Sequence, residues 1–327
     1  MILSKQQVFG ISNREEFDLA ALQIFRHQVE NGSVYKEFIA GMRIDIEKVN
    51  HVEQIPFLPV EFFKSHTIVS NSDAADVIFS SSGTTGIITS RHVVTDVSWY
   101  QESFCSAFEL FYGDIEKYTI LALLPSYLER EGSSLIYMAE DLIKQSNNPD
   151  SGFYLYNYSE LYHQLKKQQQ NKKPTLLIGV TFALLDFVEQ YRIDFPELIV
   201  METGGMKGRR KEMLKEELHA TLKEKLNIHT VYSEYGMTEL LSQGYSLQNG
   251  LFQTPPWMRI LIRDTNDPFT YLSPNKMGGI NVIDLANINS CSFIATQDLG
   301  KLHPDNYFEL MGRFDNSDIR GCNLLVE

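Results

Sequence analysis

Residues 80–86 read Ser-Ser-Ser-Gly-Thr-Thr-Gly and directly follow the apolar triplet Val77-Ile78-Phe79. The triplet predicts a short strand, and small residues after a strand let the backbone approach an anion closely. Consecutive N–H groups and hydroxyls can cradle phosphate oxygens. The loop is not a Walker A motif, because no Gly-Lys-Ser/Thr follows at the required spacing. Two interpretations remain: a nucleotide-phosphate loop, which the specific order favours, and an ordinary polar turn.

Strands and helices alternate along the chain after this loop. Residues 1–54 show apolar positions at helical spacing, and the prolines in residues 55–59 predict an extended stretch. The polar run at residues 166–173 predicts an exposed helix end or loop. The other expected elements are strands at 118–124, 175–180, 198–201, 259–262, 281–285 and 308–311, and helices at 134–143, around Phe182, Leu185 and Val188, and over Leu214, Leu218, Leu222 and Leu226.

This order of elements predicts an α/β fold of mostly parallel sheets with flanking helices and a smaller β-rich subdomain. We divide residues 1–312 into a helical N-terminal part (1–54), an α/β core (55–246) and the β-rich subdomain (247–312). Residues 313–327 are expected to form a hinge-like C-terminal stub.

Composition excludes several classes of protein. The chain has 327 residues, 43% of them hydrophobic, which is enough for a sizeable core, and its net charge of -13 disfavours a nucleic acid partner. Its three cysteines form no CxxC pair, which argues against a disulfide framework or zinc site and for a reducing compartment. No apolar run approaches the roughly 20 residues of a membrane span, and no signal pattern begins the chain. We expect a cytoplasmic protein.

A second motif, Tyr235-Gly236-Met237-Thr238-Glu239, stands at the end of another expected strand. A tyrosine ring can stack on or flank a purine, and a carboxylate can hold Mg²⁺, which takes only one or two protein carboxylates. Taken alone, the motif also fits a turn followed by a residue that stabilises a helix start.

Two further motifs lie near the C-terminus. They are Thr296-Gln297-Asp298-Leu299-Gly300 and the segment 312–318, Gly-Arg-Phe-Asp-Asn-Ser-Asp. An aspartate at a strand end can accept hydrogen bonds from both ribose hydroxyls, and a nearby arginine can donate to the sugar or to phosphate. Each motif alone is a common turn sequence.

The order of the four motifs resembles the adenylate-forming superfamily of acyl-CoA synthetases and related ligases. The resemblance spans roughly residue 79 to the C-terminus. It implies ATP and Mg²⁺ as cofactors, with Glu239 and Thr85 at the metal and Glu239, Thr85 and Arg313 in catalytic roles. It implies that the nucleotide is bound by Ser81, Ser82, Gly83, Thr84, Thr85 and Gly86 at the pyrophosphate, by Gly204, Gly205, Tyr235, Gly236, Met237 and Thr238 at the adenine, and by Asp298 and Arg313 at the ribose.

Within that superfamily the chain is most similar to LuxE-type acyl-protein synthetases, which are related to phenylacetate-CoA ligases. The similarity lies in the Ile-Pro-Phe-Leu-Pro-Val segment at 55–60, in residues 124–130 with Ser133-Ser134-Leu135, and in the tail Arg320-Gly321-Cys322. It implies activation of a fatty acid and a cysteine near the C-terminus that carries the acyl group. Cys322 is the candidate acceptor, although most lone cysteines are simply small apolar residues.

The chain departs from the family in its cations. Family members carry a mobile C-terminal domain that delivers a lysine, whereas only twelve residues follow Asp315 here and Lys301 is the last lysine. Losing one such charge-stabilising donor typically costs about 100- to 1,000-fold in rate. The loop also lacks the usual lysine after its last glycine, so Arg91 is the candidate substitute. His92, which follows it, is expected to be a surface or packing residue.

The sequence therefore predicts an acid–thiol ligase. A carboxylic acid, expected to be a fatty acid, would be converted by ATP to an acyl-adenylate and passed to a thiol, either Cys322, coenzyme A or a carrier protein, with an acyl reductase or other protein as a partner. Two alternatives stay open. One is an acyl-CoA or carrier-protein ligase of the phenylacetate-CoA ligase type, and the other is a non-catalytic nucleotide-binding subunit.

Overall fold

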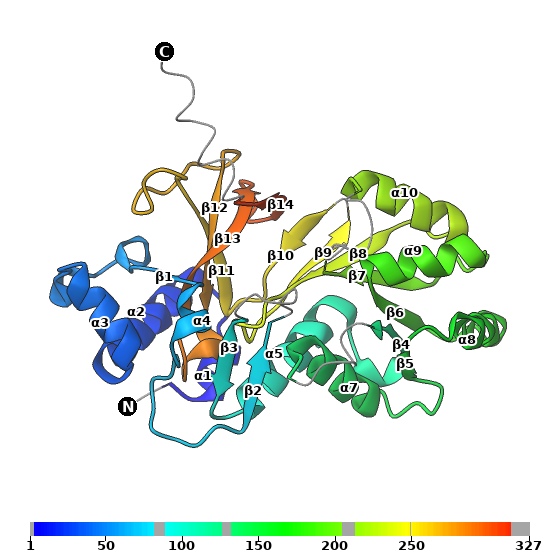
Figure 1. The fold of residues 1–327 in the computed structure, drawn as a ribbon, viewed down its shortest axis with the longest axis horizontal. Coiled ribbons are helices and arrows are strands. Elements are labelled where there is room, and N and C mark those ends of the chain that lie inside the picture. The colour runs from blue at the N-terminus through cyan, green and yellow to red at the C-terminus, as the bar shows by residue number, and fades with distance from the viewer. Residues whose placement is uncertain (1–2, 82–88, 126–131, 205–212, 249, 315–327) are drawn as a thin grey trace, which may run out of the picture. The chain divides into compact units, whose positions relative to one another are not determined.

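The computed structural model describes the chain in five stretches, residues 3–81, 89–125, 132–204, 213–248 and 250–314 (Figure 1). They form two compact units. Unit 1 contains residues 3–74 and 256–314, and unit 2 contains residues 75–255. The division of the chain at residues 54 and 246 that we derived from the sequence stays a prediction.

Unit 2 is built on one mainly parallel sheet. Its strand order is β10 (Leu251–Gln253), β9 (Gly244–Gln248), β8 (Val231–Tyr235), β7 (Ile199–Thr203), β6 (Thr175–Val180), β4 (Thr119–Leu123) and β5 (Gly152–Tyr154). The strands from β8 to β5 pair in parallel, while β9 and β10 are antiparallel additions. Every residue of β4 and β6 is buried, as expected for strands covered on both faces.

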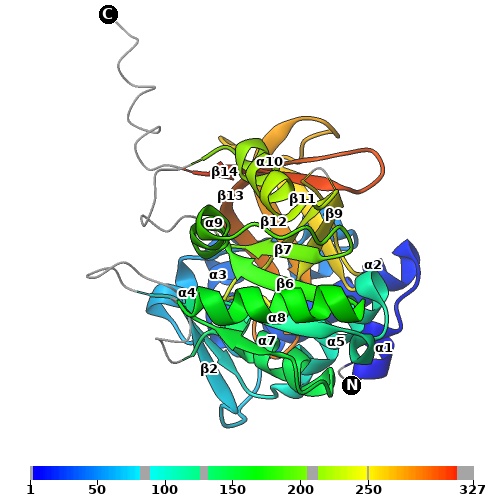
Figure 2. The same ribbon diagram turned by 90° about the vertical axis from the view of Figure 1, so that its right-hand side faces the viewer.

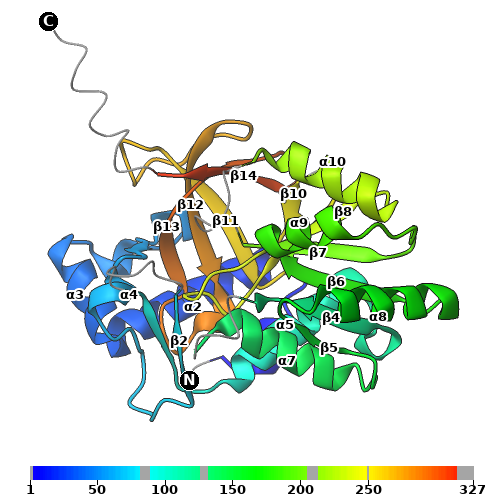
Figure 3. The same ribbon diagram turned by 45° about the vertical axis from the view of Figure 1, so that its right-hand side comes forward.

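Helices cover both faces of this sheet. Helices α8 (Tyr158–Asn171), α9 (Thr181–Gln190) and α10 (Lys215–Leu226) lie on one face, and α5 (Ser98–Tyr112) and α7 (Ser134–Gln145) lie on the other (Figures 2 and 3). Ring contacts join the helices within each group, such as Tyr158 with Phe187 at 6.2 Å and Tyr100 with Tyr137 at 5.9 Å. The chain passes from β4 outward to β5 through α7, and then back past β4 to β6 through α8. Because both crossovers are right-handed, these two helices lie on opposite faces of the sheet.

Unit 1 contains the β-rich part of the chain. Strands β11 (Met258–Arg263), β12 (Met277–Asp284), β13 (Phe293–Leu302) and β14 (Phe308–Arg313) pair antiparallel in that order, and Figure 3 shows β11, β12 and β13 side by side. The extended stretch near the N-terminus supplies β1 (Leu58–Pro59), which pairs parallel to β13.

The helices of unit 1 come from the N-terminal part of the chain. They are α1 (Lys5–Phe9), α2 (Arg14–Asn31), α3 (Ser33–Gly41), α4 (Phe62–Ser65) and the 3-10 turns Ile46–Lys48, Val52–Gln54 and Leu285–Asn287. Helix α2 begins at Asn13, whose side chain accepts a hydrogen bond from the backbone N–H of Glu16. The fully buried Gln28 donates to the carbonyls of Asn287 and Ile288 and thereby fastens α2 to the segment between β12 and β13.

The expected α/β class is confirmed, and the expected strands and helices are present with shifted ends. The largest shift is in β12, which begins at Met277 instead of the expected residue 281. Helix α10 begins one residue later than expected, because Leu214 is its N-cap and is 68% exposed instead of packing with Leu218, Leu222 and Leu226. A pattern of four-residue spacing does not show where the first turn begins. No described helix is long and apolar enough to cross a membrane.

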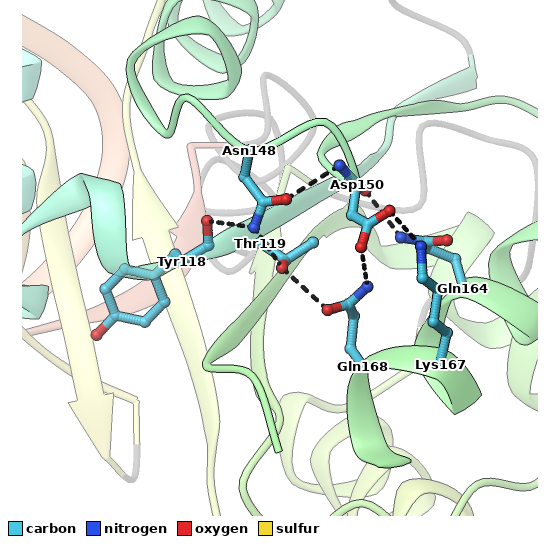
Figure 4. A network of polar contacts seen from close by, with 7 residues as sticks. All are labelled: Tyr118, Thr119, Asn148, Asp150, Gln164, Lys167 and Gln168. Atoms are coloured by element: carbon cyan, nitrogen blue, oxygen red, sulfur yellow. Dashed lines mark hydrogen bonds and ion pairs between the residues drawn. The ribbon is translucent and has the colours of Figure 1, made fainter. Parts of the chain in front are cut away.

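The polar run at residues 166–173 is a helix end, as predicted, but Gln168 within it is fully buried. Its side chain accepts from Thr119 Oγ1 at 3.2 Å and donates to Asp150 Oδ2 at 3.0 Å (Figure 4). Asn148 donates to Thr119 Oγ1 at 2.9 Å, and Lys167 Nζ lies 2.6 Å from Asp150 Oδ1. This polar network joins α8 to the amino end of β4, whereas the second motif follows the carboxyl end of β8.

Candidate nucleotide-binding site

The first motif joins the strands of a hairpin. Strands β2 (Val77–Ser80) and β3 (Arg91–Val94) pair antiparallel, and the backbone N–H of Ser81 donates to the carbonyl of Ser90 at 3.0 Å. The N–H of Ser90 donates in return to Ser81 Oγ at 2.9 Å. This reciprocal pair closes the base of the loop. The predicted phosphate ligands Ser82, Gly83, Thr84, Thr85 and Gly86 lie outside the described residues.

The second motif stands at the carboxyl end of the parallel sheet, where β8 ends at Tyr235. Tyr235 is buried, its hydroxyl lies 3.8 Å from Met237 Sδ, and its ring meets Phe252 edge-on at 6.3 Å. Gly236 is exposed, and a Cβ atom there would lie 2.3 Å from Oε1 of Glu234. Any larger residue at this position would therefore require the Glu234 carboxylate to shift.

His92 connects the hairpin to the second motif. It lies on β3 opposite Phe79, is fully buried, and its Nδ1 lies 2.8 Å from the backbone carbonyl oxygen of Thr238. The sequence reasoning assigned it to the surface or to packing, and the packing alternative is confirmed. The contact with Thr238 was missed, because nothing in the sequence shows which residue far along the chain faces a lone histidine.

Glu239, the expected magnesium ligand, is only 5% exposed. Among the described residues no group of three or more His, Cys, Asp or Glu side chains could hold a metal ion. A single carboxylate nevertheless fits Mg²⁺, because this ion commonly takes one or two protein carboxylates and fills its other positions with substrate phosphates and water. Thr85, the second expected ligand, lies outside the described residues.

The hydroxyl group of Thr181 holds the residue that follows β7. Gly204 has a φ of +67°, a value that glycine adopts readily. Its carbonyl accepts a hydrogen bond of 2.8 Å from Thr181 Oγ1, at the start of α9. This fixes one residue of the segment expected beside adenine, while the next, Gly205, lies outside the described residues.

A buried carboxylate lies on the same side of β7 as α9 and α10. Glu202 accepts from Ser233 Oγ at 2.7 Å, its Oε1 lies 3.0 Å from Lys215 Nζ, and His219 Nε2 is 3.8 Å away. Burial favours its neutral form, but the neighbouring imidazole, the lysine charge and the serine hydroxyl outweigh burial and lower the pKa of Glu202 to about 2. Glu202 is therefore ionised at neutral pH.

Glu234 lies on the opposite side of the sheet and behaves in the opposite way. Burial raises its pKa to about 7, an effect that the hydrogen bond from Thr203 Oγ1 reduces and the charge of Glu202 increases. Two neighbouring carboxylates thus have pKa values pushed far apart, a pattern common at functional sites.

The third and fourth motifs meet in unit 1. Asp298 on β13 and Arg313 on β14 are directly opposite in the sheet register, and Nε of Arg313 lies 3.2 Å from Oδ1 of Asp298. The Asp298 side chain is 15% exposed and that of Arg313 is 67% exposed. A carboxylate and a guanidinium held side by side can respectively accept from and donate to a sugar or phosphate group.

The structure thus brings two pairs of sequence-predicted regions together. Within unit 2, His92 links the strand that follows the first motif to Thr238 of the second motif. Within unit 1, Asp298 and Arg313 form an ion pair. The expected acyl acceptor Cys322 lies outside the described residues. Arg91, the candidate cation, is exposed on β3.

Comparison with known proteins finds similarity only at the level of structure. No protein-family model matches the chain, and no curated protein sequence matches it. ATP-bound MatB from Rhodopseudomonas palustris matches with a TM-score of 0.56 and 17% identity over 75% of this chain and 49% of that one. A 2-hydroxyisobutyryl-CoA ligase in complex with 2-HIB-AMP and CoA matches with a TM-score of 0.68 and 11% identity, covering 97% of this chain and 73% of that one.

These matches show the fold of the chain. The chain shares a fold with MatB and with the 2-hydroxyisobutyryl-CoA ligase, and it spans about half the length of MatB. The open conformation of the 2-hydroxyisobutyryl-CoA ligase gives the same result, with a TM-score of 0.67 and 12% identity.

Proposed function

We propose that the chain activates a carboxylic acid with ATP to form an acyl-adenylate and then transfers the acyl group to a thiol. The observation that carries this proposal is the position of the Tyr235–Glu239 motif, directly after β8 at the carboxyl end of a parallel sheet. Ligands of open α/β sheets bind beside the carboxyl ends of the strands. Solved structures that share this fold contain ATP or an acyl-AMP.

The first step is an in-line displacement at phosphorus. An oxygen of the substrate carboxylate attacks the α-phosphorus of ATP, the bond to the bridging oxygen breaks, and pyrophosphate leaves. Ser81, Ser82, Gly83, Thr84, Thr85 and Gly86 bind the departing pyrophosphate, and Gly204, Gly205, Tyr235, Gly236, Met237 and Thr238 flank the adenine. Asp298 accepts hydrogen bonds from the ribose hydroxyls, and Arg313 donates to the same sugar or to phosphate.

Glu239 and Thr85 would hold Mg²⁺, which would neutralise phosphate charge. Glu239 itself is kept in place by the buried chain around it, since His92 contacts the carbonyl of the preceding residue, Thr238. The protein's contribution here is to fix one carboxylate in position before the nucleotide arrives.

In the second step a thiolate attacks the carbonyl carbon of the mixed anhydride, and AMP leaves with one oxygen of the original carboxylate. We propose Cys322 as this thiolate, with Arg313 and Arg320 as nearby cations that would lower its pKa. The other two cysteines are poor nucleophiles, because burial raises the pKa of Cys105 to about 11 and that of Cys291 to about 12. A fatty acid substrate, a cytoplasmic location and an acyl reductase as the next acceptor complete the proposal.

A second candidate is an acyl-CoA ligase in which Cys322 has no chemical role. It is favoured by the 2-hydroxyisobutyryl-CoA ligase, whose structure contains CoA. A third candidate is a nucleotide-binding subunit without activity, which the absence of a lysine soon after the last glycine of the first motif favours.

The test is exchange of labelled pyrophosphate into ATP in the presence of carboxylic acids of increasing chain length. We expect exchange that depends on the acid and is lost in Glu239→Gln while ATP binding is retained. ATP binding by the wild-type chain without exchange under any acid would favour the inactive subunit. Turnover that requires coenzyme A, with no labelled protein, would favour the acyl-CoA ligase.

A further inference from the structure

Strand β13 contains a bulge at the third motif. In its pairing with β12, Leu299 lies opposite Gly279 and Ala295 lies opposite Asn281. Ile280 alone therefore lies opposite the three residues 296–298, so β13 has two extra residues at this point. Bulges bend a strand and re-aim its side chains, and they interrupt the ladder of backbone hydrogen bonds.

Two side chains compensate for the interrupted ladder. Thr296 Oγ1 donates to the carbonyl of Ile280 at 2.9 Å and accepts from the N–H of Asp298 at 3.1 Å. The guanidinium of Arg263, on β11, reaches across β12: Nη1 donates to the carbonyl of Ile280 at 2.7 Å and Nη2 donates to that of Thr296 at 2.6 Å. Both strands at the bulge are thus held by one planar group.

The path of this arginine depends on a glycine. A Cβ atom at Gly279 would lie 2.6 Å from Cζ of Arg263, which is closer than atoms can approach without a shift. The side chain of the buried Asn281 accepts from Nη1 of Arg263 at 2.7 Å and orients the guanidinium further. The sequence therefore provides both the space for the guanidinium and a second acceptor.

The bulge also sets the start of the segment after β14. The N–H of Phe314 donates to the carbonyl of Gln297 at 2.8 Å, and the ring of Phe314 lies 5.5 Å from the guanidinium of Arg263. Arg263 thus contacts Thr296, two residues before Asp298, and Phe314, the residue after Arg313. Asp298 and Arg313 form the ion pair described above.

We propose that Arg263 is a positioning residue for nucleotide binding: it holds the bulge at residues 296–298 so that the Asp298 carboxylate faces the ribose hydroxyls. This inference rests on the proposed function, because it takes Asp298 as the ribose ligand. Arg263 acts through Asp298 and does not touch the nucleotide.

The experiment is calorimetric titration of the purified chain with Mg-ATP and with Mg-2′,3′-dideoxy-ATP, which lacks both hydroxyls that Asp298 would bind. For the wild type we expect ATP to bind about ten- to a hundredfold more tightly, the range for hydrogen bonds to a charged group. In Arg263→Met and in Gly279→Ala we expect the ratio of the two affinities, for ATP and for the dideoxy nucleotide, to fall to within about threefold of unity. Arg263→Lys should recover little, because an ammonium cannot bridge both carbonyls as a planar fork does.

Arg259→Met is the matched control. Arg259 lies on the same strand, pairs with Asp18 and lies over the ring of Phe17, away from the bulge. It should keep the wild-type ratio, and thermal unfolding of each variant confirms that it is folded. The double variant Arg263→Met/Asp298→Asn should show no further fall beyond Asp298→Asn alone, since both changes remove the same contact.

Two results would overturn the inference in distinguishable ways. In the first, Asp298→Asn binds ATP and 2′,3′-dideoxy-ATP about equally, but the folded variants Arg263→Met and Gly279→Ala still prefer ATP as the wild type does. Arg263 then does not position Asp298, and the proposed function stands. If Asp298→Asn keeps the wild-type ratio, or if the wild type binds both nucleotides equally or not at all, the ribose role of Asp298 is wrong and the inference about Arg263 is wrong with it.

Discussion

Nδ1 of His92 lies 2.8 Å from the backbone carbonyl oxygen of Thr238, and the two residues are separated by 146 positions in the sequence. A carbonyl oxygen can only accept, so Nδ1 carries the proton and the tautomer is set by this contact. The contact ties the strand after the proposed phosphate loop to the residue that precedes the proposed metal ligand Glu239. The geometry of the second motif thus depends on a histidine outside all four motifs.

This contact predicts opposite outcomes for two amide substitutions. The amide nitrogen of Asn occupies roughly the place of Nδ1, whereas that of Gln occupies roughly the place of Nε2. His92→Gln should lower kcat/KM for ATP by about 10- to 100-fold, because small displacements of positioned groups are costly. His92→Asn should retain most of the activity. Pyrophosphate exchange measures both, and equal losses in two folded variants would show that the Thr238 contact does not matter.

The raised pKa of Glu234 predicts a pH dependence of stability. Its pKa is about 7 in the folded chain against 4.5 as the ordinary value, so the folded state binds more protons than the unfolded state between these values. Stability is therefore lost as the pH rises from about 4.5 to about 7. Glu234→Gln should remove this loss and be about 1–3 kcal/mol more stable than the wild type at pH 8, with little difference at pH 4.

Glu202 provides the comparison for that experiment. Its pKa is lowered to about 2, so its ionised form contributes stability that is fully present above about 4.5 and is lost as the pH falls through about 2. Glu202→Gln should therefore destabilise the chain at neutral pH, as followed by urea unfolding. A stabilising Glu202→Gln or a destabilising Glu234→Gln at pH 8 would contradict these assignments.

The network around Gln168 should stabilise the fold without affecting nucleotide binding. Gln168→Leu removes its bonds to Thr119 and Asp150 and leaves buried polar groups unsatisfied, which costs about 1–3 kcal/mol. The exposed neighbour Gln170 gives the control Gln170→Leu, which should change stability by less than about 0.5 kcal/mol. Thermal unfolding measures both, and ATP affinity should be unchanged because the network lies at the amino end of β4. Equal stability of Gln168→Leu and Gln170→Leu would show that the hydrogen bonds of Gln168 do not stabilise the fold.

Much of the fold was predictable from the sequence, because buried parallel strands read as short apolar runs. Residues 175–180 are such a run, and all six are buried in β6. The burial of Gln168 was not predictable, since a glutamine among lysines and glutamines has no local signal of burial. The same limit applies to Leu214, whose apolar character fits the helical spacing although the helix begins after it.

The site was predictable only as separate motifs. The order of the motifs made Asp298 and Arg313 candidate ribose ligands, a role that stays a prediction, but their ion pair depends on the register of β13 and β14. Arg263 and Gly279 show no motif at all, because a bulge is defined by pairing across strands and not by the residues of one strand. Residues that position a site through long-range contacts are visible only in the structure.

The proposed acyl acceptor predicts a single labelled position. Incubation with ATP and a labelled fatty acid, followed by digestion, should place the label on the peptide with Cys322 and leave Cys105 and Cys291 unlabelled, because their raised pKa values keep them as thiols. Cys322→Ser should abolish labelling, while the matched variant Cys105→Ser should retain it. Labelling that survives Cys322→Ser would contradict the role of Cys322.

The route of oxygen atoms tests the central claim most directly. A carboxylic acid labelled with oxygen-18 in both carboxylate oxygens, supplied with ATP and a thiol acceptor, should transfer one labelled oxygen to AMP, and mass spectrometry of the nucleotide detects it. Acyl-adenylate formation predicts that AMP is the one labelled phosphate-containing product, while the acyl product keeps the other labelled oxygen. Label in inorganic phosphate would contradict acyl-adenylate formation. AMP and ADP that both stay unlabelled during turnover would also contradict it.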